Sequence, residues 1–162
     1  MANLDGVQIR TLLSTLVAVS LTALLGGLAS RPAQSSWYQQ LKKPPYQPPR
    51  QAFPIVWPIL YADIAGVSAA ALDELEGRER RAYIAALVTN LILNGSWSWL
   101  FFNRRRLGTS ALAAGALTVS SADLTRRAAA VRGPKATPLG LYPLWCALAT
   151  VLSTHIWALN RR

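Results

Sequence analysis

The sequence of 162 residues contains a single cysteine, a single histidine and a single methionine, and only 15% of its residues are charged. A soluble domain carries roughly 25% charged residues, whereas 52% of this chain is hydrophobic. Such a chain has too little charge to cover a soluble surface, so its composition favours a membrane protein. The length fits one domain.

The scarcity of reactive side chains excludes several kinds of site. The lone Cys146 rules out an intramolecular disulfide and any multi-cysteine metal site, and its apolar surroundings in the sequence predict a small buried residue. The lone His155 has no second histidine or cysteine as a partner, so we expect no metal site and favour a helix–helix hydrogen bond. The sequence also lacks a phosphate-binding glycine loop, a nucleophile triad and an acid–base pair, which argues against a nucleotide-driven pump and against hydrolytic chemistry.

Positive charge is abundant, with a formal net charge of +10. The basic residues form short clusters between apolar runs instead of a stripe interleaved with aromatic residues, and no nucleic-acid motif is present. We therefore expect the clusters to contact lipid headgroups and expect no nucleic acid among the partners. Counting basic residues does not orient the chain, because eight would lie on one side of a five-span bundle and nine on the other.

Five apolar segments approach the roughly 20 residues that cross a bilayer as a helix. The first also resembles a signal peptide, but its length favours a retained span. The predicted spans are residues 7–28, 53–72, 83–102, 107–131 and 139–159. Short connections after the second, third and fourth spans make neighbours antiparallel, so the predicted fold is an all-α five-helix transmembrane bundle forming a single domain.

Two acidic residues lie within predicted spans and are functional candidates by default. For Asp123, pairing with Arg126 and Arg127 at helical spacing is the expectation. Asp63 is either a proton relay or, as we favour, a structural group, protonated or bonded to Ser68 or to a polar residue of another helix.

The small residues of the fourth span predict close helix packing, with the tightest points at Gly108 and Gly115. Similar small-residue faces on the first and fourth spans allow a homodimer without requiring one.

A long proline-rich loop, residues 31–51, connects the first two predicted spans. It contains WYQQLKKPPYQPP from Trp37 onward, and FPIVWPILY follows at residues 53–61. Proline at this density breaks helices and stiffens an extended chain. Three further stretches accompany it: LNGSWSWLFF at residues 93–102, LYPLWCALATVLS at residues 141–153, and IWALN at residues 156–160.

These stretches resemble the signature of the tryptophan-rich sensory protein family, also called translocator proteins, which includes the peripheral-type benzodiazepine receptor. The resemblance implies a five-helix membrane bundle that binds porphyrins, notably protoporphyrin IX, beneath the first loop, and needs no obligatory cofactor. It implies a sensory or regulatory role in a membrane, which we expect to be a bacterial cell membrane. Two alternatives stay open: a light-dependent porphyrin-degrading enzyme, and a transporter of porphyrins or other lipophilic molecules.

Residues matching the family's motifs are the candidate site. In the degrading enzyme, Trp57 and Trp145 would be the catalytic pair. The ligand-binding candidates are Trp57, Tyr61, Asn94, Trp97, Tyr142, Trp145 and Ala149. The lid or rim candidates are Trp37, Tyr38, Lys42, Lys43, Tyr46 and Arg50. Apart from the resemblance, tryptophan and tyrosine also concentrate at bilayer interfaces, and Trp37, Tyr38, Trp99 and Trp157 fit such a belt equally well.

Departures from the family pattern narrow the expectations. The fifth-helix proline is absent at Leu141 and stands at Pro143 instead. The cholesterol-type motif fails because His155 replaces its tyrosine and Ala158 replaces its basic residue, which makes cholesterol a doubtful partner. An axial contact between His155 and a porphyrin iron is an alternative that we do not favour.

Overall fold

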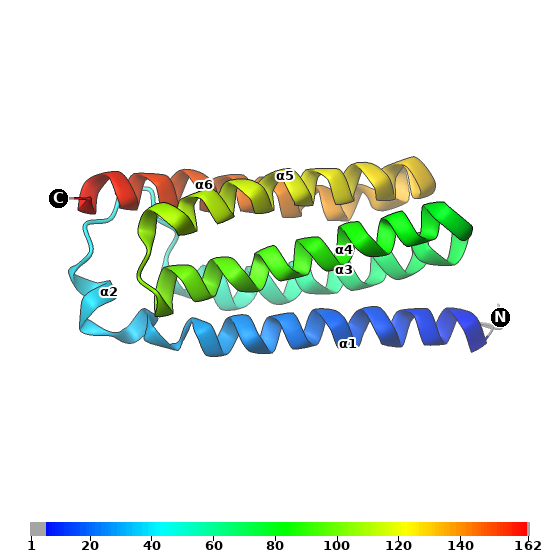
Figure 1. Cartoon of the computed structure of the whole chain (residues 1–162), viewed down its shortest axis with the longest axis horizontal. Helices are drawn as coiled ribbons and strands as arrows, with labels where there is room; N and C mark the ends of the chain where they lie inside the picture. The colour runs from blue at the N-terminus through cyan, green and yellow to red at the C-terminus, as the bar shows by residue number, and fades with distance from the viewer. Residues whose placement is uncertain (1–5, 162) are drawn as a thin grey trace.

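The computed structural model describes residues 6–161 of the chain, which are mostly helical with no strand among them. Five long helices lie roughly along one axis, and successive long helices run in opposite directions (Figure 1). Their bounds are α1 Gly6–Ala29, α3 Phe53–Glu74, α4 Gly77–Ser98, α5 Leu107–Arg132 and α6 Leu141–Asn160. The shortest has 20 residues and thus reaches about 30 Å, the thickness of a bilayer core. The all-α five-helix prediction is confirmed.

Four stretches of the described chain are long and apolar enough to cross a membrane, and they include the five long helices except for the first two residues of α1. The stretches are Gln8–Gln34, Arg50–Glu74, Gly77–Asn103 and Leu107–Asn160, and the last holds both α5 and α6. Large apolar side chains such as Leu24 and Leu112 point outward, while Asn90, Ser110 and Ser121 are fully buried. An apolar exterior around a partly polar interior suits a protein surrounded by lipid.

Helix α4 begins six residues before the predicted third span. The connection from α3 is only two residues long, and Gly77 adopts a φ of +53°, which glycine tolerates at low cost. The exposed charged residues Arg78, Glu79 and Arg81 therefore belong to the first turns of the helix. Hydropathy marks where the apolar core begins, whereas the helix extends beyond it into the polar interface.

Helices α5 and α6 pack closely through a glycine. A Cβ added at Gly108 would lie 3.0 Å from Nε1 of Trp157, and one at Gly115 would lie 3.8 Å from Cγ2 of Thr150. The tight approach predicted at Gly108 is thus confirmed, because a side chain there would require the Trp157 ring to move, whereas the contact at Gly115 has an ordinary van der Waals distance.

The proline-rich segment between α1 and α3 contains short helices. These are η1 Arg31–Gln34, α2 Ser36–Gln40 and η2 Arg50–Ala52, joined by an extended stretch. We call residues 31–52 the lid. The lid covers the end of the bundle at which the chain also terminates (Figure 1), and this end is called the lid end below. Helix α4 continues there into a π-helical turn, η3 Trp99–Asn103.

Candidate ligand-binding cavity

A cavity of about 690 Å³ lies between α1, α3, the last turns of α4 and the lid. Helix α1 contributes mainly small residues, including Ala23, Gly26 and Gly27, and so leaves the space open. A Cβ added at Gly26 would lie 3.8 Å from both Tyr61 Oη and Ser98 Oγ. The volume falls within the roughly 300–1,000 Å³ typical of small-molecule sites.

Aromatic rings form two walls of this cavity. Trp57 and Tyr61 lie one turn apart on α3, and their rings stack with centroids 5.4 Å apart and an interplanar angle of 27°. Trp97 and Phe102 line the cavity from α4 and η3. Nε1 of Trp97 donates a hydrogen bond to Ser153 Oγ at 3.2 Å, which fixes the indole against α6. Rings held in this way offer flat faces for stacking.

The lid supplies the polar corner of the cavity through Tyr38, Gln47 and Arg50. Nε2 of Gln47 donates to Tyr38 Oη at 3.3 Å, but the buried Oε1 of Gln47 has no hydrogen-bond partner among the described residues. Burial raises the pKa of the Tyr38 hydroxyl, which therefore keeps its proton as a potential donor. A buried acceptor without a donor is costly and is expected to be satisfied by water or a ligand.

Contacts with α6 hold the lid in place. Asn160 bonds both backbone polar groups of one lid residue: its Oδ1 accepts from Lys42 N at 3.0 Å, and its Nδ2 donates to Lys42 O at 2.8 Å. Tyr46 Oη and His155 Nδ1 are 2.9 Å apart. The partner of His155 is thus a lid tyrosine and not another long helix, which corrects the expectation of a helix–helix bond.

Removing the Asn160 side chain is expected to loosen the lid. In an Asn160→Ala variant we expect amide exchange at residues 41–43 to accelerate about five- to thirtyfold, because the change removes two hydrogen bonds to Lys42 and each contributes roughly 1 kcal/mol or less. Hydrogen–deuterium exchange mass spectrometry measures this directly. Ser14→Ala, which removes an exposed side-chain bond on α1, serves as the control. Unchanged exchange at residues 41–43 would show that other contacts hold the lid.

A chain of hydrogen bonds leads from the cavity wall through the bundle. Tyr61 Oη donates to Asn94 Oδ1 at 2.8 Å, and Asn94 Nδ2 donates to Tyr142 Oη at 3.1 Å. Tyr142 Oη donates to Asn90 Oδ1 at 2.8 Å, and Asn90 Nδ2 donates to Ser120 Oγ at 3.2 Å. This polar chain joins α3, α4, α6 and α5, and fixes the orientation of the Tyr61 hydroxyl.

Comparison with known proteins assigns the family. The sequence model described as the TspO/MBR family matches residues 14–158. The chain belongs to the TspO/MBR family. The resemblance seen in the sequence is thereby confirmed, and the chain is a multi-pass integral membrane protein.

Named relatives of the TspO/MBR family include mammalian and bacterial proteins. The chain is 34% identical over 147 residues to the translocator protein of Bos taurus, covering 88% of this chain and 85% of the relative. It is 30% identical over 131 residues to the uncharacterized membrane protein YtaB of Bacillus subtilis, covering 80% and 83% respectively. It is 26% identical over 129 residues to the tryptophan-rich protein TspO of Bacillus cereus, covering 80% and 84%.

The cavity brings together part of the candidate set carried over from the family. Trp57, Tyr61 and Trp97 line it from the helices, and Tyr38 and Arg50 line it from the lid. Asn94 and Tyr142 lie behind this wall in the polar chain. Their hydrogen bonds hold the Tyr61 hydroxyl in place from behind the lining.

The remaining candidates lie outside the lining. Trp145 packs edge-on against the lining residue Phe53, with centroids 5.7 Å apart, and Ala149 lies further along α6. In the lid, Trp37 packs on Phe101. Lys42 and Tyr46 bond α6, and Lys43 Nζ lies 4.0 Å from the Tyr38 ring centroid.

Sequence reasoning missed several residues that line the cavity. The most important are Gly26 and Gly27 of α1, together with Gln47, Phe53 and Phe102. The family motifs begin at Trp37, so they carry no information about α1. The signal available was the Gly-Gly pair in an otherwise apolar span, which indicates space or close packing.

The structure bears differently on the predictions for the two acidic residues within spans. Asp123 bonds Arg126 and Arg127, each at 2.6 Å, as predicted from their spacing. Ser68, one partner considered for Asp63, instead accepts a hydrogen bond from Tyr83 at 3.1 Å. Asp63 does not line the cavity, although its neighbour Ala62 does.

Proposed function

We propose that this protein binds a flat lipophilic tetrapyrrole, protoporphyrin IX or a close relative, in the cavity beneath the lid. A sensory or regulatory role in porphyrin metabolism would follow from such binding. The observation that carries the proposal is the cavity itself, which combines stacked aromatic walls with a polar corner at the lid. Its ligand would serve as a reversible occupant, so no obligatory cofactor is required.

The chemistry of the lining supports a ligand with an apolar body and polar groups at one edge. The Trp57 and Trp97 rings would contact the macrocycle, while Arg50 and the Tyr38 hydroxyl would meet its carboxylates. Arg50 is also held in place, because its Nη2 donates to Ala33 O at 3.0 Å across the lid.

The distribution of tryptophans supports binding more than degradation. The degrading enzyme was expected to use Trp57 and Trp145 as a catalytic pair, but only Trp57 lines the cavity. Trp145 is separated from it by Phe53. A transporter would need a second opening for the ligand, and we identify no feature that favours one.

A binding titration tests the proposal. Purified protein should shift the visible spectrum of protoporphyrin IX and lose tryptophan fluorescence at a saturable stoichiometry. Trp57→Ala should weaken binding about tenfold, since an aromatic contact contributes roughly 0.5–1.5 kcal/mol beyond the burial of its area. Trp99→Ala should leave affinity unchanged, because Trp99 does not line the cavity. An unshifted porphyrin spectrum would refute the proposal.

The role of Arg50 can be isolated by changing the ligand as well as the protein. Arg50→Gln should weaken binding of protoporphyrin IX about five- to tenfold, because a hydrogen bond to a charged group contributes roughly 1.5 kcal/mol or less when exposed. The same variant should bind the dimethyl ester of protoporphyrin as well as wild type does, since the ester has no carboxylate. Equal weakening for both ligands would mean that Arg50 acts through the shape of the lid.

A further inference from the structure

A second hollow lies on the outside of the bundle, between α1 and α4, with a volume of about 700 Å³. We call it the outer groove. Its lining is Ala18, Thr22, Leu25, Leu28 and Ala29 of α1, Val88, Leu91, Ile92, Gly95 and Ser96 of α4, and Trp99 and Leu100 of η3. Leu25 and Ile92 are 63% and 62% exposed, so the groove opens toward the surrounding lipid. The Thr22 hydroxyl donates to Ala18 O within its own helix, so the lining is apolar apart from Ser96.

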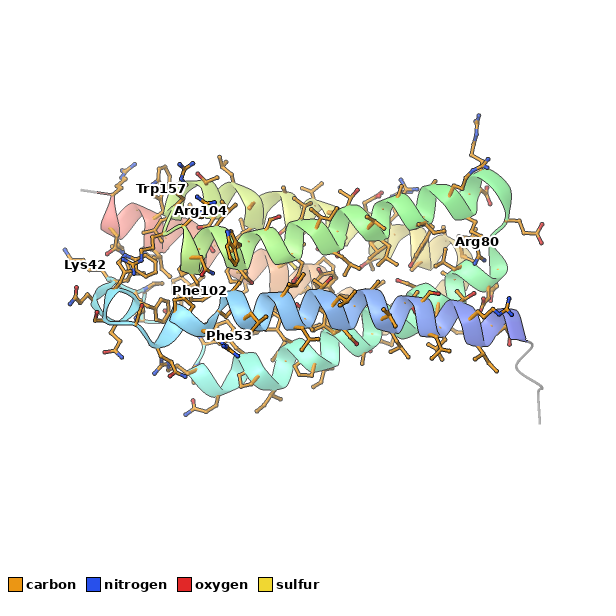
Figure 2. The ribbon with its side chains drawn as sticks, turned by 60° about the horizontal axis from the view of Figure 1, so that its bottom comes forward. Lys42, Phe53, Arg80, Phe102, Arg104 and Trp157 are labelled. Carbon is orange, nitrogen blue, oxygen red and sulfur yellow. The ribbon has the colours of Figure 1, made fainter. Side chains whose placement is uncertain are left out.

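The outer groove ends beside a cluster of arginines. At its lid end, Asn103 Nδ2 donates to Ala29 O at 2.7 Å and so ties η3 to the end of α1. The next three residues are Arg104, Arg105 and Arg106, all exposed, and no ion pair involves them among the described residues. Arg104 lies at the same end of the bundle as Lys42 and Trp157, whereas Arg80 lies at the opposite end (Figure 2).

The backbone at Arg105 has an unusual conformation. Its φ is +54°, the one positive value at a non-glycine residue in the described chain, and side chains other than glycine adopt this conformation only at a cost in free energy. The turn directs the guanidinium over the Trp37 ring, 5.2 Å from its centroid. Arg105, the middle residue of the arginine cluster, is thus held between the end of α4 and the lid.

Charge is distributed unequally between the two ends of the bundle. The described residues at the lid end include eight basic side chains and no Asp or Glu. The basic ones are Arg31, Lys42, Lys43, Arg50, Arg104, Arg105, Arg106 and Arg161. At the opposite end, basic residues alternate with carboxylates and several are paired, as Arg126 and Arg127 are with Asp123. The lid end therefore needs anions from outside the chain.

We propose that the outer groove binds an acyl chain of an anionic phospholipid, whose headgroup phosphate is bound by Arg104, Arg105 and Arg106. The hydrocarbon lining fits the chain, and the unpaired guanidiniums fit the phosphate, which they bind in bidentate geometry. A second copy of this protein is a poorer occupant. Two copies related by a two-fold axis along the membrane normal would bring both arginine clusters to the same side, with no carboxylate there to offset them.

Native mass spectrometry of the full chain, released from bilayer discs of mixed phosphatidylglycerol and phosphatidylcholine, tests this proposal. Wild type should retain phosphatidylglycerol in preference to phosphatidylcholine. The triple variant Arg104→Gln, Arg105→Gln, Arg106→Gln should lower that preference at least about fivefold, since each basic residue near an anionic surface contributes about 1 kcal/mol. The control triple Arg10→Gln, Arg78→Gln, Arg81→Gln removes the same charge from exposed residues at the opposite end and should keep the preference.

A groove-filling variant gives a second, independent measurement. Gly95 lines the outer groove and a Cβ added there meets no atom within 4 Å, so the side chain of Gly95→Leu is expected to extend into the groove. It should reduce retention of both lipids. The proposal is overturned by equal retention of the two lipids in wild type or by equal loss in the two triple variants. It is also overturned by a lipid-free dimer that Gly95→Leu converts to monomer, which would make a second copy the occupant.

Discussion

A Gly26→Leu variant is expected to lose porphyrin binding by on the order of a hundredfold, because its side chain would occupy the space reserved for the ligand. Forcing additional methylenes into a filled site costs about 1–3 kcal/mol. The first carbon of the new side chain would lie at an ordinary contact distance of 3.8 Å from its nearest neighbours, Tyr61 and Ser98, so the helix packing should survive. Absorbance titration with protoporphyrin IX measures the loss.

The control for this variant is the same substitution at a glycine that faces away from the cavity. Gly95→Leu adds an identical side chain to the outer groove and should leave porphyrin affinity unchanged. Thermal unfolding of both variants in detergent should stay close to wild type. Normal porphyrin binding by Gly26→Leu would place the ligand outside the cavity between α1 and α3.

A Tyr142→Phe variant is expected to destabilise the protein by about 2 kcal/mol. The change deletes a single oxygen but breaks two hydrogen bonds, leaving Asn94 Nδ2 and Asn90 Oδ1 without their partner in the bundle interior. Each unsatisfied buried group costs about 1–3 kcal/mol in proteins, and hydrogen bonds in membrane proteins contribute toward the lower end. Unfolding in mixed micelles of increasing denaturing detergent measures the difference.

Tyr83→Phe is a matched comparison because it also removes a buried tyrosine hydroxyl. Tyr83 Oη is an end group that donates only to Ser68 Oγ. Its removal should cost about 1 kcal/mol. A chain that joins four helices should lose more than a pair that joins two, so equal destabilisation by the two variants would show that the polar chain has no structural role beyond its separate pairs.

The helices could be predicted from the sequence because apolar runs of bilayer length have few alternatives to helix. The positions of the helix ends could not be predicted in this way. Helix α4 starts at Gly77 because a helix in the polar interface needs no apolar residues, and the lid contains α2, which is too short for periodicity to reveal. The turn at Arg105 depends on tertiary contacts with Trp37 that no local pattern encodes.

The candidate site was predictable where motif residues lie on α3. Trp57 and Tyr61 are one turn apart and necessarily share a face. Whether a residue on another helix faces the cavity depends on how that helix is rotated about its axis. The motifs do not reveal this rotation. Asn94 remains a candidate ligand contact, and its bonds to Tyr61 and Tyr142 could not be predicted because they depend on which polar groups the bundle brings near it.

The charge asymmetry of the bundle could have been predicted from the sequence. Counting basic residues alone gave similar totals on the two sides, but the carboxylates between the second and third predicted spans lie on the side opposite the lid. The fold confirms that the described carboxylates lie away from the lid end, so the basic residues near the lid lack acidic partners within the described chain.

The most direct test of the central claim is an experimental structure of the protein in complex with protoporphyrin IX. The cavity predicts a macrocycle in contact with the Trp57 ring, enclosed by α1 and α3, with its carboxylates near Arg50 and Tyr38 under the lid. A macrocycle bound in the outer groove, or on the outer surface of α5 and α6, would contradict the account.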